Sequence, residues 1–133
     1  MPLSPYLWFN GQCETAFKLY EKVLGGKIES KITHAESPDA DKVSPDWRNK
    51  IMHATLKIGD NVLMGSDVPP QYYQKPQGLT VSFSVKSPED AERIFRTLSE
   101  KGSVTMPLQQ TFWAKKFGMF TDQFGIPWMI NCE

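Results

Sequence analysis

The chain has 133 residues, of which 15 are acidic and 15 basic, so its formal net charge is zero. This length fits one domain with a core of its own, and an apolar content of 40% argues against a disordered chain. The sequence has no basic block and no apolar run long enough to span a membrane, so we expect neither nucleic acid nor a membrane as a partner. The N-terminal residues also lack the pattern of a signal peptide.

The two cysteines, Cys13 and Cys132, do not form a metal-binding or redox spacing. Two thiols without such a spacing are typical of a protein in a reducing compartment, so we predict a cytoplasmic location and find no support for a disulfide. Cys13 lies on the apolar stripe of a predicted helix and is expected in the core. Cys132, one residue from the end of the sequence, is a candidate for an exposed thiol.

The first half of the chain predicts a strand, a helix and three further strands. Leu7 and Phe9 are apolar residues separated by one position, the alternation that is typical of a strand. A helix follows in GQCETAFKLYEKVLGG, because its apolar residues recur on one stripe and two glycines end it. The other strands are expected in KIESKITHAE and in IMHATLKIGDNVLMGSD, which turns near Gly59. Residues 36–50 are irregular and are interpreted as a solvated loop or as a cover for a site.

The second half repeats this order. Alternation from Leu79 to Val85 predicts a strand, and SPEDAERIFRTLSEKGS predicts a helix with an N-cap at Ser87. SVTMPLQQ predicts the next strand, and FWAKKFGMFTDQFGIPWMIN predicts a hairpin that turns at residues 122–125. Asp122 in this turn is interpreted as turn chemistry rather than as a catalytic acid.

The two halves also match weakly in sequence, which indicates an internal repeat. Residues of similar character recur at a fixed offset in the two predicted helices: Glu14 and Glu89, Ala16 and Ala91, Lys18 and Arg93, Leu19 and Ile94, Tyr20 and Phe95, Val23 and Leu98. We predict a single domain with a first module over residues 1–68, a linker at residues 69–77 and a second module over residues 78–133.

Three motifs in order, SPYLWFNGQCETAFKLYEKVLGG, HATLKIGDNVLMGSD and FWAKKFGMFTDQFGIPWMIN, resemble the PhnB-like subfamily of the vicinal-oxygen-chelate superfamily. That superfamily includes glyoxalase I, extradiol dioxygenases and bleomycin-resistance proteins. The resemblance implies an α+β fold of two tandem βαβββ modules, whose curved mixed sheets form a cup. Some PhnB-like proteins carry a methyltransferase label, but no Gly-rich loop follows a parallel strand here, so we predict no cofactor.

Strand alternation then separates a core face from a cup face. The residues expected to face the helices are Leu7, Phe9, Ala54, Leu56, Ile58, Leu79, Val81, Phe83 and Val85. The residues expected to line the cup, with His53, are Tyr6, Trp8, Asn10, Thr55, Thr80, Ser82, Met129 and Asn131. Trp113 and Trp128 join Tyr6 and Trp8 in an aromatic-rich set, interpreted either as a stacking wall for a ligand or as core and dimer packing.

Metal-dependent members of the superfamily hold one divalent ion with His, Gln or Glu ligands. The windows that match these positions are residues 4–6, 53–55, 79–81 and 128–130, and only His53 among them is a suitable ligand. We therefore predict no metal site. This departure from the enzymatic pattern weakens any transfer of a metal-dependent activity.

His53 is the candidate catalytic residue, because an imidazole titrates near neutral pH and serves as a general acid or base. The alternatives are a polar anchor for a ligand and a hydrogen-bonded structural histidine. His34 is expected to be solvated. Lys115 and Lys116 are interpreted as solvated residues or as an anchor for an anion.

Three functions remain open at this point. The first is a homodimeric protein that binds a small molecule in a metal-free, aromatic-lined cup. The second is a lyase or dioxygenase-type enzyme of the same superfamily that uses His53 as acid, base or partial metal ligand. The third is a structural or regulatory dimer whose cup is filled by its own side chains. A second titratable group close to His53 would favour the enzyme.

Overall fold

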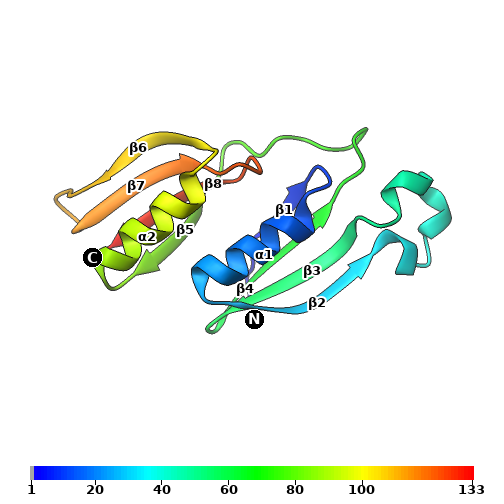
Figure 1. The fold of residues 1–133 in the computed structure, drawn as a ribbon, viewed down its shortest axis with the longest axis horizontal. Helices are drawn as coiled ribbons and strands as arrows, with labels where there is room; N and C mark the ends of the chain where they lie inside the picture. The colour runs from blue at the N-terminus through cyan, green and yellow to red at the C-terminus, as the bar shows by residue number, and fades with distance from the viewer. Residues whose placement is uncertain (1) are drawn as a thin grey trace. The chain divides into compact units, whose positions relative to one another are not determined.

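The computed structural model describes residues 2–133 and divides into two compact units, one ending at Lys75 and the other spanning Pro76–Glu133. The first unit contains β1 (Tyr6–Phe9), α1 (Cys13–Leu24), β2 (Lys27–Thr33), β3 (Ile51–Ile58) and β4 (Asn61–Asp67). The second contains β5 (Val81–Val85), α2 (Pro88–Ser99), β6 (Ser103–Gln109), β7 (Lys116–Thr121) and β8 (Pro127–Cys132) (Figure 1).

Each unit is built on one four-stranded mixed sheet with the same topology. The strand order is β1-β4-β3-β2 in the first unit and β5-β8-β7-β6 in the second. The first strand of each unit runs parallel to the last, and the other pairs are antiparallel. The predicted tandem βαβββ fold is therefore confirmed, strand by strand.

Both helices begin as the sequence indicated, and α1 also ends at the predicted glycines, whereas α2 ends at Ser99, before Gly102. Gly25 adopts φ 75° directly after α1, a left-handed conformation that glycine takes without steric cost. At the start of α2 the Ser87 hydroxyl accepts the Asp90 N–H at 3.0 Å, and Pro88 occupies the first turn. The apolar stripe of each helix is buried.

One face of each sheet packs against its helix. In the first unit Leu7, Phe9 and Leu56 are almost completely buried. Glycines let the helices approach closely: a Cβ atom at Gly65 would lie 3.0 Å from the Phe17 ring, and one at Gly118 would lie 2.6 Å from the Phe95 ring. The opposite face of each sheet is thereby left without a covering helix from its own unit.

Asp67, at the end of β4, is a buried carboxylate that joins three elements. Its Oδ1 accepts the N–H of Cys13 at 2.9 Å, and its Oδ2 accepts the N–H of Ile51 at 2.8 Å. These donors begin α1 and β3, so Asp67 fixes both starts to β4. Burial raises the pKa of the Cys13 thiol, and the charges of Asp67 and Glu14 raise it further, so this thiol stays neutral.

Asp122 plays a similar part in the turn between β7 and β8. Its Oδ1 accepts the N–H groups of Phe124 at 2.9 Å and Ile126 at 3.0 Å. Its Oδ2 accepts the indole N–H of Trp128 at 2.9 Å. The predicted role in turn chemistry is thus confirmed, and Asp122 also orients the Trp128 ring.

The structure corrects three expectations about burial. Leu79 lies before the start of β5 and is 58% exposed, so the core alternation does not extend to it. Cys132 is completely buried, because it ends β8 on the same face as Ile130. His34 is not simply solvated, since it is partly buried and its Nε2 donates to the Asp67 carbonyl oxygen at 2.9 Å.

Candidate functional site

The uncovered sheet face of the first unit carries an aromatic and polar group, formed by Tyr6, Trp8, His53 and Thr55. Tyr6 and Trp8 alternate with buried neighbours on β1 and are 43% and 44% exposed. His53 and Thr55 alternate in the same way on β3. Four predicted site residues therefore lie on this one face.

Hydrogen bonds connect three of these side chains, with His53 between Tyr6 and Thr55. The hydroxyl oxygen of Tyr6 lies 3.1 Å from His53 Nδ1, and the hydroxyl oxygen of Thr55 lies 3.1 Å from His53 Nε2. The rings of Tyr6 and His53 also approach with centroids 5.7 Å apart. Sequence analysis placed these residues on one face but did not predict that both imidazole nitrogens would have hydroxyl partners.

The three hydrogen-bonded side chains combine an imidazole with two hydroxyl groups. A neutral imidazole donates from one ring nitrogen and accepts at the other, whereas a hydroxyl group can do either. Either tautomer of His53 can therefore donate to one of these hydroxyl groups and accept from the other. The second titratable group that an acid–base function requires is present as Tyr6.

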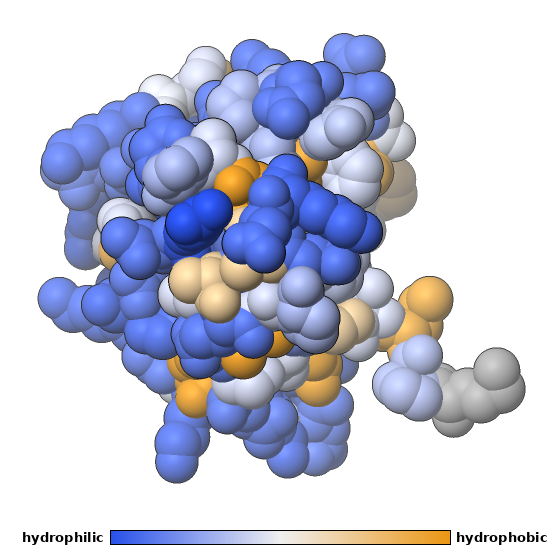
Figure 2. Space-filling view, turned by 90° about the vertical axis from the view of Figure 1, so that its right-hand side faces the viewer, coloured by the Kyte–Doolittle hydropathy of each residue, from blue (hydrophilic) through white to orange (hydrophobic). Residues whose placement is uncertain are grey.

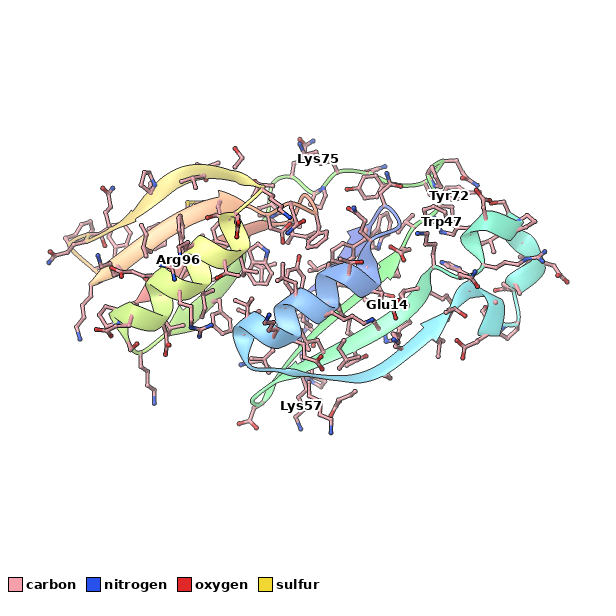
Figure 3. The ribbon with its side chains drawn as sticks, in the orientation of Figure 1. Glu14, Trp47, Lys57, Tyr72, Lys75 and Arg96 are labelled. Carbon is pink, nitrogen blue, oxygen red and sulfur yellow. The ribbon has the colours of Figure 1, made fainter. Side chains whose placement is uncertain are left out.

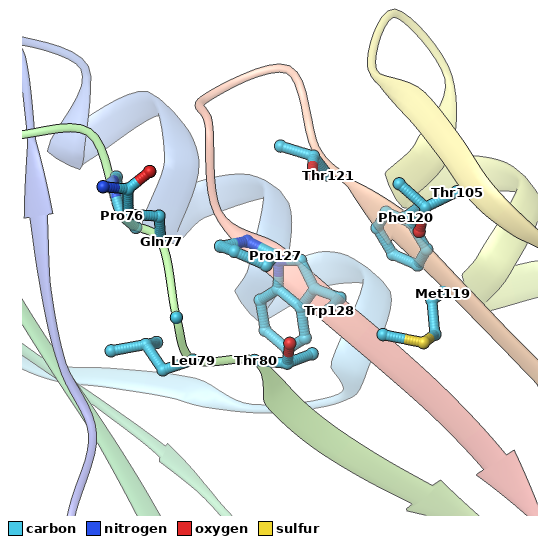
Figure 4. A pocket seen from close by; sticks show the side chains of 11 residues that line it. Pro76, Gln77, Leu79, Thr80, Thr105, Met119, Phe120, Thr121, Pro127 and Trp128 are labelled. Atoms are coloured by element: carbon cyan, nitrogen blue, oxygen red, sulfur yellow. The ribbon is translucent and has the colours of Figure 1, made fainter.

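A hollow of about 480 Å³ lies within the second unit, at one end of its sheet. Figure 4 shows its wall, which combines apolar and hydroxyl-bearing side chains. The lining residues are Pro76, Gln77, Gly78, Leu79, Thr80, Thr105, Met119, Phe120, Thr121, Pro127 and Trp128. Its volume falls in the range of about 300–1,000 Å³ that is usual for small-molecule sites.

The predicted site residues of the second unit lie only partly at this hollow. Thr80 lines it, whereas Ser82, Met129 and Asn131 do not. Met129 is nevertheless close, because it pairs across the sheet with the lining residue Met119. Asn131 Oδ1 is buried and has no hydrogen-bond partner within residues 2–133.

Within the second unit, the two tryptophans of the aromatic-rich set have different surroundings. Trp128 is only 1% exposed and donates to Asp122, so most of its ring belongs to the core of the second unit. Trp113 lies between β6 and β7, stacks edge-on with Phe112 and Phe117, and does not line the hollow. Asn10 follows β1 in a bend and is exposed.

Sequence analysis missed several residues of the hollow. Met119 and Thr121 alternate with the buried Phe120 on β7, so strand periodicity alone could have identified them. Thr105 could also be found in this way, because its neighbour Val104 pairs with the buried Phe120. Met106 pairs with Met119, so Thr105 is the extra residue of a β-bulge, and no alternation rule predicts the bulge itself.

The irregular segment between β2 and β3 forms three short 3₁₀ turns and packs on the loop before α1. Figure 3 labels Trp47 in this segment. A Cβ atom at Gly11 would lie 3.3 Å from the Trp47 ring, and Lys50 Nζ donates to the Gly11 carbonyl at 3.1 Å. The segment therefore covers this loop.

A divalent metal of the kind held by related enzymes does not fit these side chains. Among residues 2–133, no three His, Cys, Asp or Glu side chains gather closely enough to hold an ion. The partners of His53 are neutral hydroxyl groups, which bind Zn²⁺ or Ni²⁺ poorly beside a single imidazole.

Chelator-stripped protein should therefore retain no stoichiometric Zn²⁺, Ni²⁺, Mn²⁺ or Fe²⁺ after incubation and desalting. Metal content by mass spectrometry measures this directly, with His53→Ala as the matched variant. Retention of one equivalent that is lost in His53→Ala would contradict the expectation and would make His53 a ligand.

No helix in the described part of the chain is long and apolar enough to cross a membrane. In the view of Figure 2 the surface is mostly hydrophilic, and apolar residues form small separate groups.

Comparison with known proteins agrees with this fold. The model of the Glyoxalase/Bleomycin resistance protein/Dioxygenase superfamily matches residues 3–130, and the chain belongs to that superfamily. It is 38% identical to protein YjdN of Escherichia coli strain K12, over 98% of this chain and 95% of that protein. The resemblance predicted from the three motifs is thus confirmed.

Two solved structures share this fold. Protein PA1353 of Pseudomonas aeruginosa is 48% identical, with a TM-score of 0.91 over 100% of this chain and 98% of that one. The PhnB protein of Bacillus cereus has a TM-score of 0.82 over the full length of both chains. Its identity of 23% makes it evidence for the fold alone.

Proposed function

We propose that this protein binds a small organic molecule, and that the hollow of the second unit is a binding site. The observation that carries the proposal is an open hollow of about 480 Å³ with apolar walls and a few hydroxyl groups, the usual composition of a small-molecule site. Thr80, predicted from the sequence to line a cup, is part of its wall. Membership of the superfamily supports the same function.

Indole is a suitable first probe, because it is flat, largely apolar and carries one hydrogen-bond donor. Amide chemical shifts of the ¹⁵N-labelled protein should change on titration at Gly78, Thr80 and Thr121, with a dissociation constant of about 1 mM or below, or about −4 kcal/mol. The hairpin turn at Gly59 should not respond. Absence of saturable shifts, or shifts spread evenly over the chain, would refute the proposal.

Two tryptophan substitutions on β6 provide a matched pair. Thr105 lines the hollow, whereas Ser103 lies on the same strand, is also exposed and does not line it. Thr105→Trp should occupy the hollow and reduce indole affinity at least about tenfold, since the ring takes the volume that the ligand needs. Ser103→Trp should bind indole as the original chain does. Equal binding by both variants would place the site elsewhere.

The Tyr6–His53 hydrogen bond favours a second candidate function, acid–base catalysis on a carbonyl compound. A base within reach of a C–H group next to a carbonyl removes its proton, which then exchanges with solvent. Dihydroxyacetone in D₂O is a simple probe, and NMR follows deuterium incorporation in the presence of a chelator. This candidate predicts exchange that is lost in His53→Gln and reduced in Tyr6→Phe. Exchange that is equal in the original chain and in His53→Gln would eliminate it.

We also propose that the protein is a homodimer, as the superfamily resemblance implies. The exposed aromatic side chains Phe112 and Trp113 support an associating surface, because large apolar side chains are seldom left in water without a partner. Sedimentation velocity at micromolar concentration tests the proposal, and a single monomeric species would refute it.

A further inference from the structure

We infer that the hollow of the second unit selects an uncharged, flat molecule with a hydroxyl or carbonyl group, and discriminates against carboxylates and phosphonates. This inference rests on the proposed function, because it names the class of ligand for the same hollow. It follows from three features of the wall: its lack of charged residues, its threonine hydroxyl groups and a buried carboxylate beneath Trp128.

The wall offers no positive charge to an anion. None of the lining residues is Lys, Arg or His. Leu79, Met119 and Pro127 instead present apolar surface. An anion that entered would lose part of its hydration without gaining an ion pair, and this loss costs several times more than the loss of water around a neutral polar group.

The polar groups of the wall suit an uncharged ligand. Thr80, Thr105 and Thr121 each bring a hydroxyl group, which can donate or accept one hydrogen bond. A ligand hydroxyl or carbonyl can therefore be matched in either direction. The apolar residues between them bind the rest of a flat molecule by contact alone.

The β-bulge at Thr105 contributes to this arrangement. Val104 pairs with the buried Phe120, while Met106 pairs with Met119, whose side chain lines the hollow. Thr105 follows Val104 and therefore faces the opposite side of the sheet, the side of the hollow, and the extra residue lets Met106 pair with Met119 as well. Bulges commonly redirect a side chain in this manner next to functional sites.

Asp122 adds an unfavourable charge for anions. Its Oδ2 accepts the Trp128 indole N–H at 2.9 Å, so this donor is already occupied and is not available to a ligand. Asp122 is 3% exposed and follows the lining residue Thr121 directly. Its carboxylate is held by three N–H donors of the turn and of Trp128, so the charged group beside the wall is negative rather than positive.

A matched pair of probes tests the charge selectivity. 2-Naphthol and 2-naphthoate have the same ring system, but only 2-naphthoate is charged at neutral pH. We expect 2-naphthol to shift the amide signals of Thr80, Thr105 and Thr121 and to bind at least about tenfold more tightly than 2-naphthoate. Equal affinities at these residues would overturn the inference while leaving the binding function intact. Failure of indole and both naphthyl compounds to bind would overturn the binding function as well.

A charge introduced at the rim gives a second, independent test. Leu79 is 58% exposed, so its replacement should not disturb the core. Leu79→Lys should bind 2-naphthoate about fivefold more tightly than Leu79→Gln does, the effect of one ion pair in water, whereas the two variants should bind 2-naphthol equally. Leu79→Gln is the control for loss of the apolar side chain. The inference would be wrong if Leu79→Lys and Leu79→Gln bound 2-naphthoate equally.

Discussion

Replacement of Asp67 by asparagine should lower the free energy of unfolding by about 3 kcal/mol. The asparagine side chain keeps one acceptor oxygen, but its amide group would face the backbone N–H of either Cys13 or Ile51. Two donors would then be buried against each other, and the negative charge at the start of α1 would also be lost. Urea unfolding followed by circular dichroism measures the change.

Asp60→Asn is the matched control for Asp67→Asn, because it makes the same chemical change at an exposed turn between β3 and β4. Its effect on the free energy of unfolding should stay within about 0.5 kcal/mol.

The reactivity of the Cys13 thiol is a second, local measurement, since this thiol is buried at the start of α1. Cys13 should react faster with a disulfide reagent in Asp67→Asn than in Asp60→Asn. Equal stability of the two variants would show that Asp67 does not hold these elements together.

The elements of this fold were predictable because each carries a local signal. The stripe that includes Phe17 and ends at Gly25 defines α1, and Ser87 with Pro88 marks the start of α2. Strand alternation also placed Tyr6 and His53 on one face. These signals depend on the backbone period and on short-range hydrogen bonds, so a single sequence contains them.

The candidate site was less predictable because its residues depend on pairing between strands. The Tyr6–His53 contact requires β1 and β3 to lie in the same sheet at the observed register, with β4 between them. The bulge that brings Met106 opposite Met119 depends on the partner strand β7. Trp128 was interpreted either as a wall residue or as core, and it lines the hollow while Asp122 holds most of its ring in the core. Each of these outcomes is a relation between segments, which local periodicity does not encode.

Replacement of Asp122 by alanine should have the largest effect on stability, a loss of about 4 kcal/mol. The variant leaves three donors without their acceptor, namely the N–H groups of Phe124 and Ile126 and the indole N–H of Trp128. Two of these donors belong to the turn itself, so the variant should also loosen the β7–β8 connection. Urea unfolding measures the loss, with Asp60→Ala at the exposed turn of the first unit as the control.

The same substitution should weaken binding in the hollow even under conditions where the protein stays folded. Thr121 and Pro127, on either side of this turn, both line the hollow, so a loosened turn moves two parts of its wall. Indole affinity should fall at least about tenfold in Asp122→Ala.

Trp128→Phe separates the two roles of Asp122, because it removes the indole donor but keeps both backbone donors of the turn. Its stability loss should lie near 1–2 kcal/mol, between those of Asp60→Ala and Asp122→Ala. If Trp128→Phe were as destabilising as Asp122→Ala, the indole bond rather than the turn would hold the wall in place.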